Sequence, residues 1–470
     1  MHFPAAPLSP AAVQAGATAA YDTNRDGKAD FFTYADAAGR ITRIGYDVDG
    51  DAVADQIVNL DEVSFAGRRH IVIILDGFGY DVLKGYYDSG GLRLFHPPSR
   101  VIAPYPTLTD LALEDALGYI PCHGFEAKYY DRRANRIVGG SGAYLSGTNE
   151  PYNRLLDYRA GLIWDAIGYV APWEVFGKEV NDLVRLVDRQ DRREVLAYMV
   201  SSAGVSTARG AEGQLRALRL IDRLAHQLVW SSRGLVQLTL LADHGHSYTP
   251  ARRIPLEKYL TTKGWRMTGS LREPNDVAYI RFGLETYASF ACRRPAELAA
   301  DLAGCQGVTI VSYAEGESVV VLSSDGGRAT ITKSGGRYKY EAASGDPLKL
   351  SGILGSLSAD AQGFYDDRAL FEATALHEYP DALARLWRAH FSLAANTPDV
   401  IISLADEYYS GSTSFGDTVK VASTHGGLNR KNSTTFIMST AGPLPAVMRS
   451  ADIPANMTAL LGRPWPAKKP

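Results

Sequence analysis

Two short apolar runs, each followed by an aspartate, constrain the fold of this 470-residue chain more than any other feature. The first runs from Ile71 to Leu75 and is followed by Asp76 and a glycine; the second, LVQLTLLA, is followed by Asp243. Such runs are typical of buried strands, and helical patterns alternate with them along the chain. The alternation predicts an α/β fold with a mostly parallel sheet. Ligands bind beyond the carboxyl ends of such strands, so Asp76 and Asp243 are candidates for one site.

The chain divides into segments of different pattern. Residues 1–20 are rich in alanine and proline and are expected to form a flexible tail, and residues 21–65 a small β-hairpin module. Residues 66–470 are expected to form the main α/β domain. Within it, residues from about 296 to 350 alternate apolar and polar positions between glycine turns, which predicts an antiparallel β insertion. The N-terminus lacks the charged and apolar regions of an intact signal peptide, but it fits a chain from which a signal has been removed, so a periplasmic or secreted location is expected.

The module contains two acidic runs that suit calcium. Carboxylates at alternate positions, with a glycine for the sharp bend, can wrap one hard cation in oxygen ligands. Neither run has the glutamate that closes an EF-hand loop, so both resemble the short Asp-rich loops of extracellular modules. Acidic turns that only join strands are the alternative. The candidate calcium ligands are Asp22, Asn24, Asp26 and Asp30 in the first run and Asp47, Asp49, Asp51 and Asp55 in the second.

Composition excludes several classes of protein. Lys and Arg number 49 against 52 Asp and Glu, a net charge of −3, so no stable complex with nucleic acid is expected. No apolar run reaches the roughly 18 residues of a membrane-spanning helix. The three cysteines form no disulfide framework; Cys292 and Cys305 could pair or could be buried free thiols. The oligomeric state is not predicted.

Four clusters carry groups that can do chemistry. They are LDG ending at Gly77, PYPTLTD from Pro104, ADHGHS from Ala242 and THGG from Thr424. Together they supply carboxylates, imidazoles and hydroxyls on strand ends or tight loops. That is a ligand set for a divalent metal, with a hydroxyl that the metal could activate. Within ADHGHS, His246 could support the metal ligands or be an ordinary loop residue.

The order and flanks of these clusters resemble the alkaline phosphatase superfamily, in particular its type I phosphodiesterase/nucleotide pyrophosphatase branch. PYPTLTD is similar to the family's nucleophile loop, HGFEAKYYDRRANRIVGG to the segment that follows, and LLADHGHS and STHGGL to its metal-binding loops. The resemblance covers roughly residues 70–250 and 395–445. It implies an alkaline-phosphatase-like sandwich, and Thr109 as the nucleophile that attacks phosphorus.

Members of this family hold two metals, commonly zinc. The resemblance places Asp76, Thr109, Asp243 and His244 around one of them and His425 at the other. A hydroxyl bound to a metal can attack an ester phosphorus, and two cations stabilise the entering and leaving oxygens.

The stretch that supplies the rest of the second metal site departs from the family pattern. With Tyr198 and Gly210 as anchors, Ala203 stands where an aspartate is expected and Thr207 where a histidine is expected. Neither replaces a carboxylate or an imidazole, which leaves His425 alone at that position. The second metal site is therefore expected to be incomplete, so the protein would bind one or two divalent metals.

The sequence predicts a metal-dependent hydrolase of phosphoric esters, acting through Thr109 on a phosphorylated small molecule or a nucleotide-like substrate. The alternative is a catalytically silent relative that binds an anionic ligand or a protein partner. DLA follows Thr109 where the family usually has FPN, a segment that helps to bind the phosphoryl oxygens. A sulfatase is disfavoured because its signature is missing from the nucleophile loop, and a cofactor-independent phosphoglycerate mutase because it would use serine.

Overall fold

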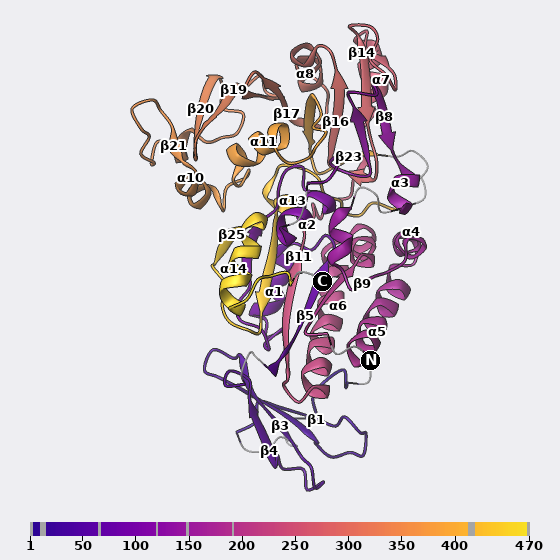
Figure 1. Ribbon diagram of the computed structural model, residues 1–470, viewed down its shortest axis with the longest axis vertical. Coiled ribbons are helices and arrows are strands. Elements are labelled where there is room, and N and C mark those ends of the chain that lie inside the picture. The colour runs from indigo at the N-terminus through magenta and orange to yellow at the C-terminus, as the bar shows by residue number, and fades with distance from the viewer. Residues whose placement is uncertain are drawn as a thin grey trace.

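The structure is a computed structural model that describes residues 3–9, 16–63, 67–118, 121–146, 150–189, 192–411 and 419–467 (Figure 1). A central sheet with its helices occupies the middle of the molecule, a second and larger sheet lies above it in this view, and the N-terminal module lies below. Of the predicted tail, residues 1–2 and 10–15 lie outside the described residues, whereas Phe3 is buried against Tyr21 and Phe31.

Seven strands form the central sheet. Their spatial order is β25 (Val447–Arg449), β6 (Ser99–Ile102), β24 (Thr434–Ser439), β11 (Val236–Ala242), β5 (Arg69–Leu75), β10 (Glu194–Met199) and β9 (Tyr158–Arg159). Only β24 runs antiparallel to its two neighbours; the other four pairs are parallel. The prediction of an α/β fold with a mostly parallel central sheet is confirmed.

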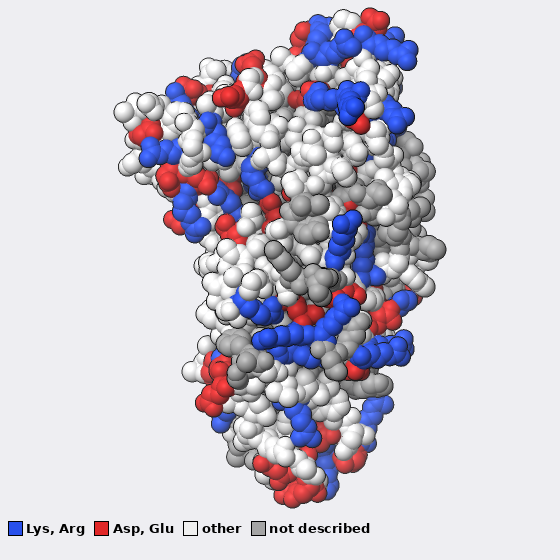
Figure 2. Space-filling view, in the orientation of Figure 1, with Lys and Arg blue, Asp and Glu red and all other residues white. Residues whose placement is uncertain are grey.

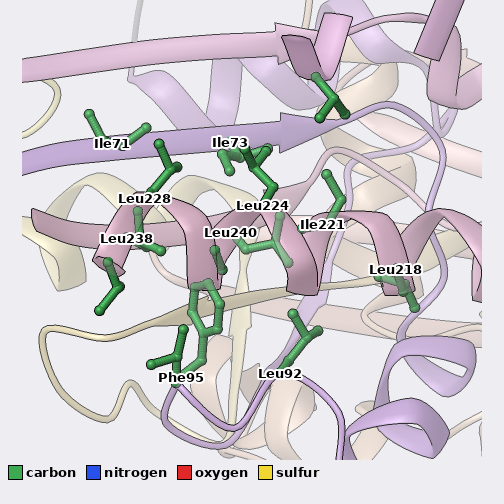
Figure 3. Packing of buried hydrophobic residues seen from close by; sticks show 14 of the residues in the cluster. Ile71, Ile73, Leu92, Phe95, Leu218, Ile221, Leu224, Leu228, Leu238 and Leu240 are labelled. Carbon is green, nitrogen blue, oxygen red and sulfur yellow. The ribbon is translucent and has the colours of Figure 1, made fainter. Parts of the chain in front are cut away.

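Helices cover both faces of this sheet because its strands are buried on both sides. Ile71 and Ile73 of β5 belong to a cluster with Leu218 and Ile221 of the long helix α6 (Ser201–Ser231), as Figure 3 shows. On the opposite face, alternate residues of β5 pack against α2 (Thr109–Leu117) and α14 (Ile453–Leu461). Successive side chains of a strand point to opposite faces, so an uninterrupted apolar run fits a sheet between two helical layers. The other helical elements near this sheet are α1 (Tyr80–Asp88), η3 (Pro151–Leu155), α4 (Leu162–Val170), α5 (Pro172–Arg189), α13 (Arg430–Ser433) and η4 (Ser450–Asp452).

The predicted β insertion is part of a second sheet of nine strands. β17 (Val308–Glu315), β18 (Ser318–Ser323), β19 (Arg328–Ser334) and β20 (Arg337–Ser344) are consecutive antiparallel strands. They extend a sheet that also contains β22 (Val400–Leu404), formed by the apolar run PDVIISL that begins at Pro398, and β22 pairs antiparallel with β17. The remaining strands of this sheet are β13 (Arg266–Met267), β14 (Asp276–Ile280), β16 (Tyr287–Cys292) and β21 (Tyr365–Asp366). Other elements of this half are β7 (Lys128–Asp131), β8 (Arg136–Gly139), α3 (Ser141–Ser146), β12 (Arg252–Arg253), α7 (Leu256–Thr262), β15 (Leu284–Glu285), α8 (Pro295–Ala303), α9 (Ser351–Leu354), α10 (Asp367–Thr374), α11 (Ala382–Phe391) and β23 (Tyr408–Gly411).

The N-terminal module is a four-stranded antiparallel sheet. β2 (Phe31–Ala35) and β3 (Ile41–Tyr46) form the predicted hairpin, and β1 (Ala19–Tyr21) and β4 (Gln56–Asn59) flank it. Its apolar side joins the hydrophobic cluster of the main domain, and the Tyr46 hydroxyl donates to the carbonyl of Trp230, 2.9 Å away. The two Asp-rich runs connect β1 to β2 and β3 to β4. Acidic side chains gather at the lower tip of the face in Figure 2, where this module lies.

Two further expectations concern cysteines and membranes. All three cysteines are described, buried and free, so Cys292 and Cys305 are not paired. Among the described helices none is long and apolar enough to cross a membrane.

Candidate functional site

The pairing of β5 with β11 brings the two predicted aspartates together. Leu75 lies opposite Ala242 in the register of these parallel strands, so Asp76 and Asp243 follow paired residues at the same edge of the sheet. This is the edge where the carboxyl ends of parallel strands leave room for a ligand. Both aspartates are buried, with exposed fractions of 5% and 1%.

Asp76, Asp243 and His244 form one cluster in which each residue offers a ligand atom within 4.8 Å of the others. Nε2 of His244 lies 3.4 Å from Oδ2 of Asp243 and 3.8 Å from Oδ1 of Asp76. The remaining carboxylate oxygens are fixed by hydrogen bonds. Oδ1 of Asp243 accepts from the backbone N–H groups of Gly77 and His244, both at 2.8 Å, and the Tyr198 hydroxyl donates to Oδ2 of Asp76.

Thr109 completes this cluster from a separate element. It is the first residue of α2, and its Oγ1 lies 3.4 Å from Nε2 of His244. The first N–H groups of a helix have no partner within the helix and point outward, which makes a helix start suitable for phosphoryl oxygens. The structure therefore brings together a hydroxyl, two carboxylates and an imidazole, all predicted from the sequence.

The charges and lone pairs in this cluster could hold a cation. Nδ1 of His244 lies 3.0 Å from the carbonyl of Gly245 and donates to it, so the unprotonated Nε2 faces the carboxylates. Burial lowers the pKa of His244 to about 4 and raises the pKa of Asp243. Oδ2 of Asp243 is buried and receives no backbone N–H from the described residues, and a hydrogen bond from the Thr109 hydroxyl lowers the pKa of this carboxyl against the effect of burial. Oxygen and nitrogen lone pairs this close repel each other unless a proton or a metal cation lies between them, and the donor set is one that zinc accepts.

His425 lies beside the cluster. Its ring stacks on that of His244 at a centroid distance of 3.9 Å, and its Nδ1 lies 2.9 Å from the carbonyl of Thr107, to which it donates. Burial, and next the neighbouring His244, lower the pKa of His425 to about 3, so its Nε2 carries a lone pair for a ligand. His425 is nevertheless not part of the three-residue cluster.

Ala203 and Thr207 lie next to the site, in the first two turns of α6. The neighbouring Ser202 places its Oγ within hydrogen-bond distance of the backbone of Asp76, and the carbonyl of Thr207 accepts from the N–H of Ser423, 3.2 Å away. The helix start thus runs past the cluster with small or neutral side chains where the resemblance implies a carboxylate and an imidazole. Within the part of the chain that the structure describes, no second group of three metal-ligating side chains forms around His425.

His246 is a site residue whose role the sequence left open. Its side chain is fully buried, its ring lies 5.4 Å from that of His425, and its Nδ1 lies 2.7 Å from Oγ of Ser423. The spacing of two residues from His244 was the only signal in the sequence, and loop conformation decides where such a side chain points.

The Asp-rich loops are held by their own carboxylates. Asp22 accepts from the N–H of Gly27 at 2.9 Å, and Asp47 accepts from the N–H of Ala52 at 2.7 Å, each five residues on. In the second loop Asp47, Asp49 and Asp55 place carboxylate oxygens within 4.8 Å of one another. The two loops are neighbours, since Nζ of Lys28 donates to the carbonyl of Gly50, 2.8 Å away. The other predicted calcium ligands, Asn24, Asp26, Asp30 and Asp51, lie in the same two loops.

Comparison with known proteins finds similarity in structure only. No family model and no curated protein matches the chain. Murine ectonucleotide pyrophosphatase/phosphodiesterase 5 matches with 12% identity over 84% of this chain and 95% of its own, at a TM-score of 0.47. The human protein gives 13% identity, the same coverage and a TM-score of 0.46. An inactive variant of the murine protein in complex with AMP gives 12% identity and a TM-score of 0.46. At these identities and TM-scores the likeness carries no argument about family or activity.

Proposed function

We propose that the chain is a metal-dependent hydrolase of phosphoric esters, preferably diesters, that acts through Thr109. One observation carries the proposal. The Thr109 hydroxyl lies 3.4 Å from a buried imidazole nitrogen, which in turn lies within 3.8 Å of two carboxylate oxygens, at the ligand-binding edge of the sheet. Asp76, Asp243, His244 and Thr109 would hold one divalent cation, for which zinc fits the donor set.

Each residue has a definite task in this mechanism. A bound cation would lower the pKa of the threonine hydroxyl and polarise a phosphoryl oxygen. The oxygen of Thr109 would then lose its proton and attack phosphorus, and one ester oxygen would take up a proton and leave as the alcohol. Water would next split the bond between Thr109 and phosphorus, releasing a phosphomonoester when the substrate is a diester. Asp76 and Asp243 are held by Tyr198 and by backbone N–H groups, so they need no reorganisation when charge develops.

The residues at the expected second metal position indicate an enzyme that is slow or inactive. Ala203 and Thr207 contribute no charge and no imidazole, so the leaving oxygen would lack the second cation that the family uses. The same two residues favour the second candidate function. In it, the protein is a catalytically silent relative that binds an anionic, nucleotide-like ligand or a protein partner.

Replacing the nucleophile decides between these candidates. The zinc-loaded chain should hydrolyse bis(p-nitrophenyl) phosphate or a nucleotide p-nitrophenyl ester, and Thr109→Ala should remove that turnover while leaving zinc content largely intact. Thr109→Ser keeps a hydroxyl and is the matched control. If wild type turns over no mono- or diester with any of several divalent metals, the binding role is the better description. Turnover that survives in Thr109→Ala would show that another group is the nucleophile.

We further infer that the two Asp-rich loops bind calcium. The repeat of the same carboxylate spacing, the bends at Gly27 and Gly50, and the cluster of Asp47, Asp49 and Asp55 support this proposal. Calcium at exposed loops suits the millimolar concentrations outside cells. A periplasmic or secreted location is therefore proposed with it.

A further inference from the structure

His246 has a buried ring nitrogen, Nε2, without a hydrogen-bond partner among the described residues. The side chain has an exposed fraction of 0%. The ring lies over Gly77, directly after Asp76; a Cβ at Gly77 would come within 3.0 Å of Nε2. Burying a polar nitrogen without a partner costs roughly 1–3 kcal/mol, a cost that a bound group would remove.

The hydrogen bonds of Ser423 decide which nitrogen of His246 carries the hydrogen. Oγ of Ser423 accepts from the backbone N–H of Tyr248, 2.8 Å away, and lies 2.7 Å from Nδ1 of His246. Among the described residues, the hydrogen bonds of the Ser423 hydroxyl go to these two groups, and Nδ1 is the one of the two that can accept. The serine therefore donates to Nδ1, and in the neutral ring the hydrogen lies on Nε2.

The three imidazoles of the site are consequently of two kinds. Nδ1 of His244 and Nδ1 of His425 each donate to a backbone carbonyl, which leaves a lone pair on Nε2, as a metal ligand requires. Nδ1 of His246 accepts instead, so its Nε2 is a hydrogen-bond donor, placed beside Gly77 next to Asp76.

His246 lies near the position where the second metal site lacks its expected carboxylate and imidazole. Ser423, which holds His246, also donates its backbone N–H to the carbonyl of Thr207, so His246 lies on the side of the site where Ala203 and Thr207 occur. Thr109 and His425 are partly exposed, so an anion would enter from their side. We infer that Nε2–H of His246 donates a hydrogen bond to a phosphoryl oxygen of the substrate, in part replacing the second cation. This role rests on the proposed function, because it assigns a partner for the substrate in the same site.

A metal ligand at His246 is the competing arrangement. It would need the lone pair on Nε2 and the hydrogen on Nδ1, and the hydroxyl hydrogen of Ser423 would then have no acceptor among the described residues. Metal content and anion affinity separate the two arrangements.

The first experiment measures the affinity of the zinc-loaded protein for inorganic phosphate by calorimetry, with zinc per chain determined on the same samples. His246→Ala should weaken phosphate binding about 10- to 100-fold, as expected for a lost hydrogen bond to a charged group, and should leave zinc per chain unchanged. His246→Gln keeps an N–H donor and should recover part of the affinity. The matched control is His390→Ala, because His390 is also buried, bonds Ser312 at 2.9 Å through Nε2, and also has an unpartnered ring nitrogen.

The second experiment observes the hydrogen directly. Long-range ¹H–¹⁵N correlation spectra should show the Nε2–H form for His246 and the Nδ1–H form for His244 and His425, with His246→Gln identifying the first set of signals.

Three results would overturn the inference. Loss of zinc in His246→Ala would make His246 a metal ligand, and a phosphate affinity as unchanged as that of the control variant would make it a packing residue. A wild-type protein that binds no phosphate would also overturn it. Phosphate binding that depends on His246, in a chain without esterase turnover, would support the inference while refuting the proposed hydrolase.

Discussion

Replacing Asp243 by asparagine should stabilise the metal-free protein and remove most of its response to zinc. Oδ1 of Asp243 accepts two backbone N–H groups, and an amide oxygen can do the same. Oδ2 receives no N–H from the described backbone and lies 3.4 Å from Nε2 of His244. An amide NH₂ in its place would donate to that nitrogen and would remove a buried charge, a gain of about 1–3 kcal/mol.

The size of the zinc response follows from mass action. At zinc 100-fold above Kd, wild type gains about 2.7 kcal/mol. If loss of one of the few protein ligands weakens binding about 100-fold, the variant gains only about 0.4 kcal/mol at the same zinc concentration. For a chain of this length the unfolding entropy corresponds to about 1 °C per kcal/mol. Zinc should therefore raise the Tm of wild type by about 3 °C and that of the variant by less than about 1 °C.

Scanning calorimetry with excess chelator and then with zinc measures both effects. Asp222→Asn is the contrasting control, because Asp222 accepts hydrogen bonds from Tyr86 and Leu92 and hydrogen bonding lowers its pKa against the effect of burial. That variant should lose stability with or without zinc. If Asp243→Asn also lowers Tm in chelator, the charge of Asp243 is already compensated within the protein, and the argument for a cation at this site fails.

Three further predictions concern other parts of the chain. Calcium should raise Tm relative to excess chelator, by about 3 °C at 100-fold above Kd, and Asp47→Ala should reduce the effect; an unchanged Tm would leave the acidic loops as simple turns. Ala203→Asp combined with Thr207→His should raise esterase turnover by at least about 10²-fold and add metal per chain, whereas either change alone should do little; no added metal would show that these two positions do not flank a second metal site. Burial raises the pKa of Glu114 to about 7, so the folded state retains a proton that the unfolded state loses above about 4.5. The free energy of unfolding of wild type should therefore fall by about 1–3 kcal/mol as pH rises from 4.5 to 7, and Glu114→Gln should lose that dependence. Denaturant titrations at several pH values measure both. If the free energies of wild type and variant change in parallel with pH, Glu114 is not responsible.

Much of the fold was predictable because its signals are local. The apolar run before Asp76 predicts a buried strand, and the alternation in residues 296–350 predicts antiparallel strands, whichever partners they find. The pairing of these strands was not predictable. PDVIISL has the pattern of a central parallel strand, yet β22 pairs antiparallel in the second sheet, since burial on both faces gives the same sequence pattern in either kind of sheet.

The sequence by itself determined the chemical groups of the site. Asp76, Thr109, Asp243 and His244 each stand at the end of a strand or the start of a helix, and such positions can be read along the chain. Only the tertiary structure decided how His246 is used. Its role depends on a hydroxyl 177 residues away in the chain, and which ring nitrogen carries the hydrogen follows from that contact and not from any neighbour in sequence. Strand ends are set by local periodicity, whereas a hydrogen-bond network is set by which loops the packed sheet brings together.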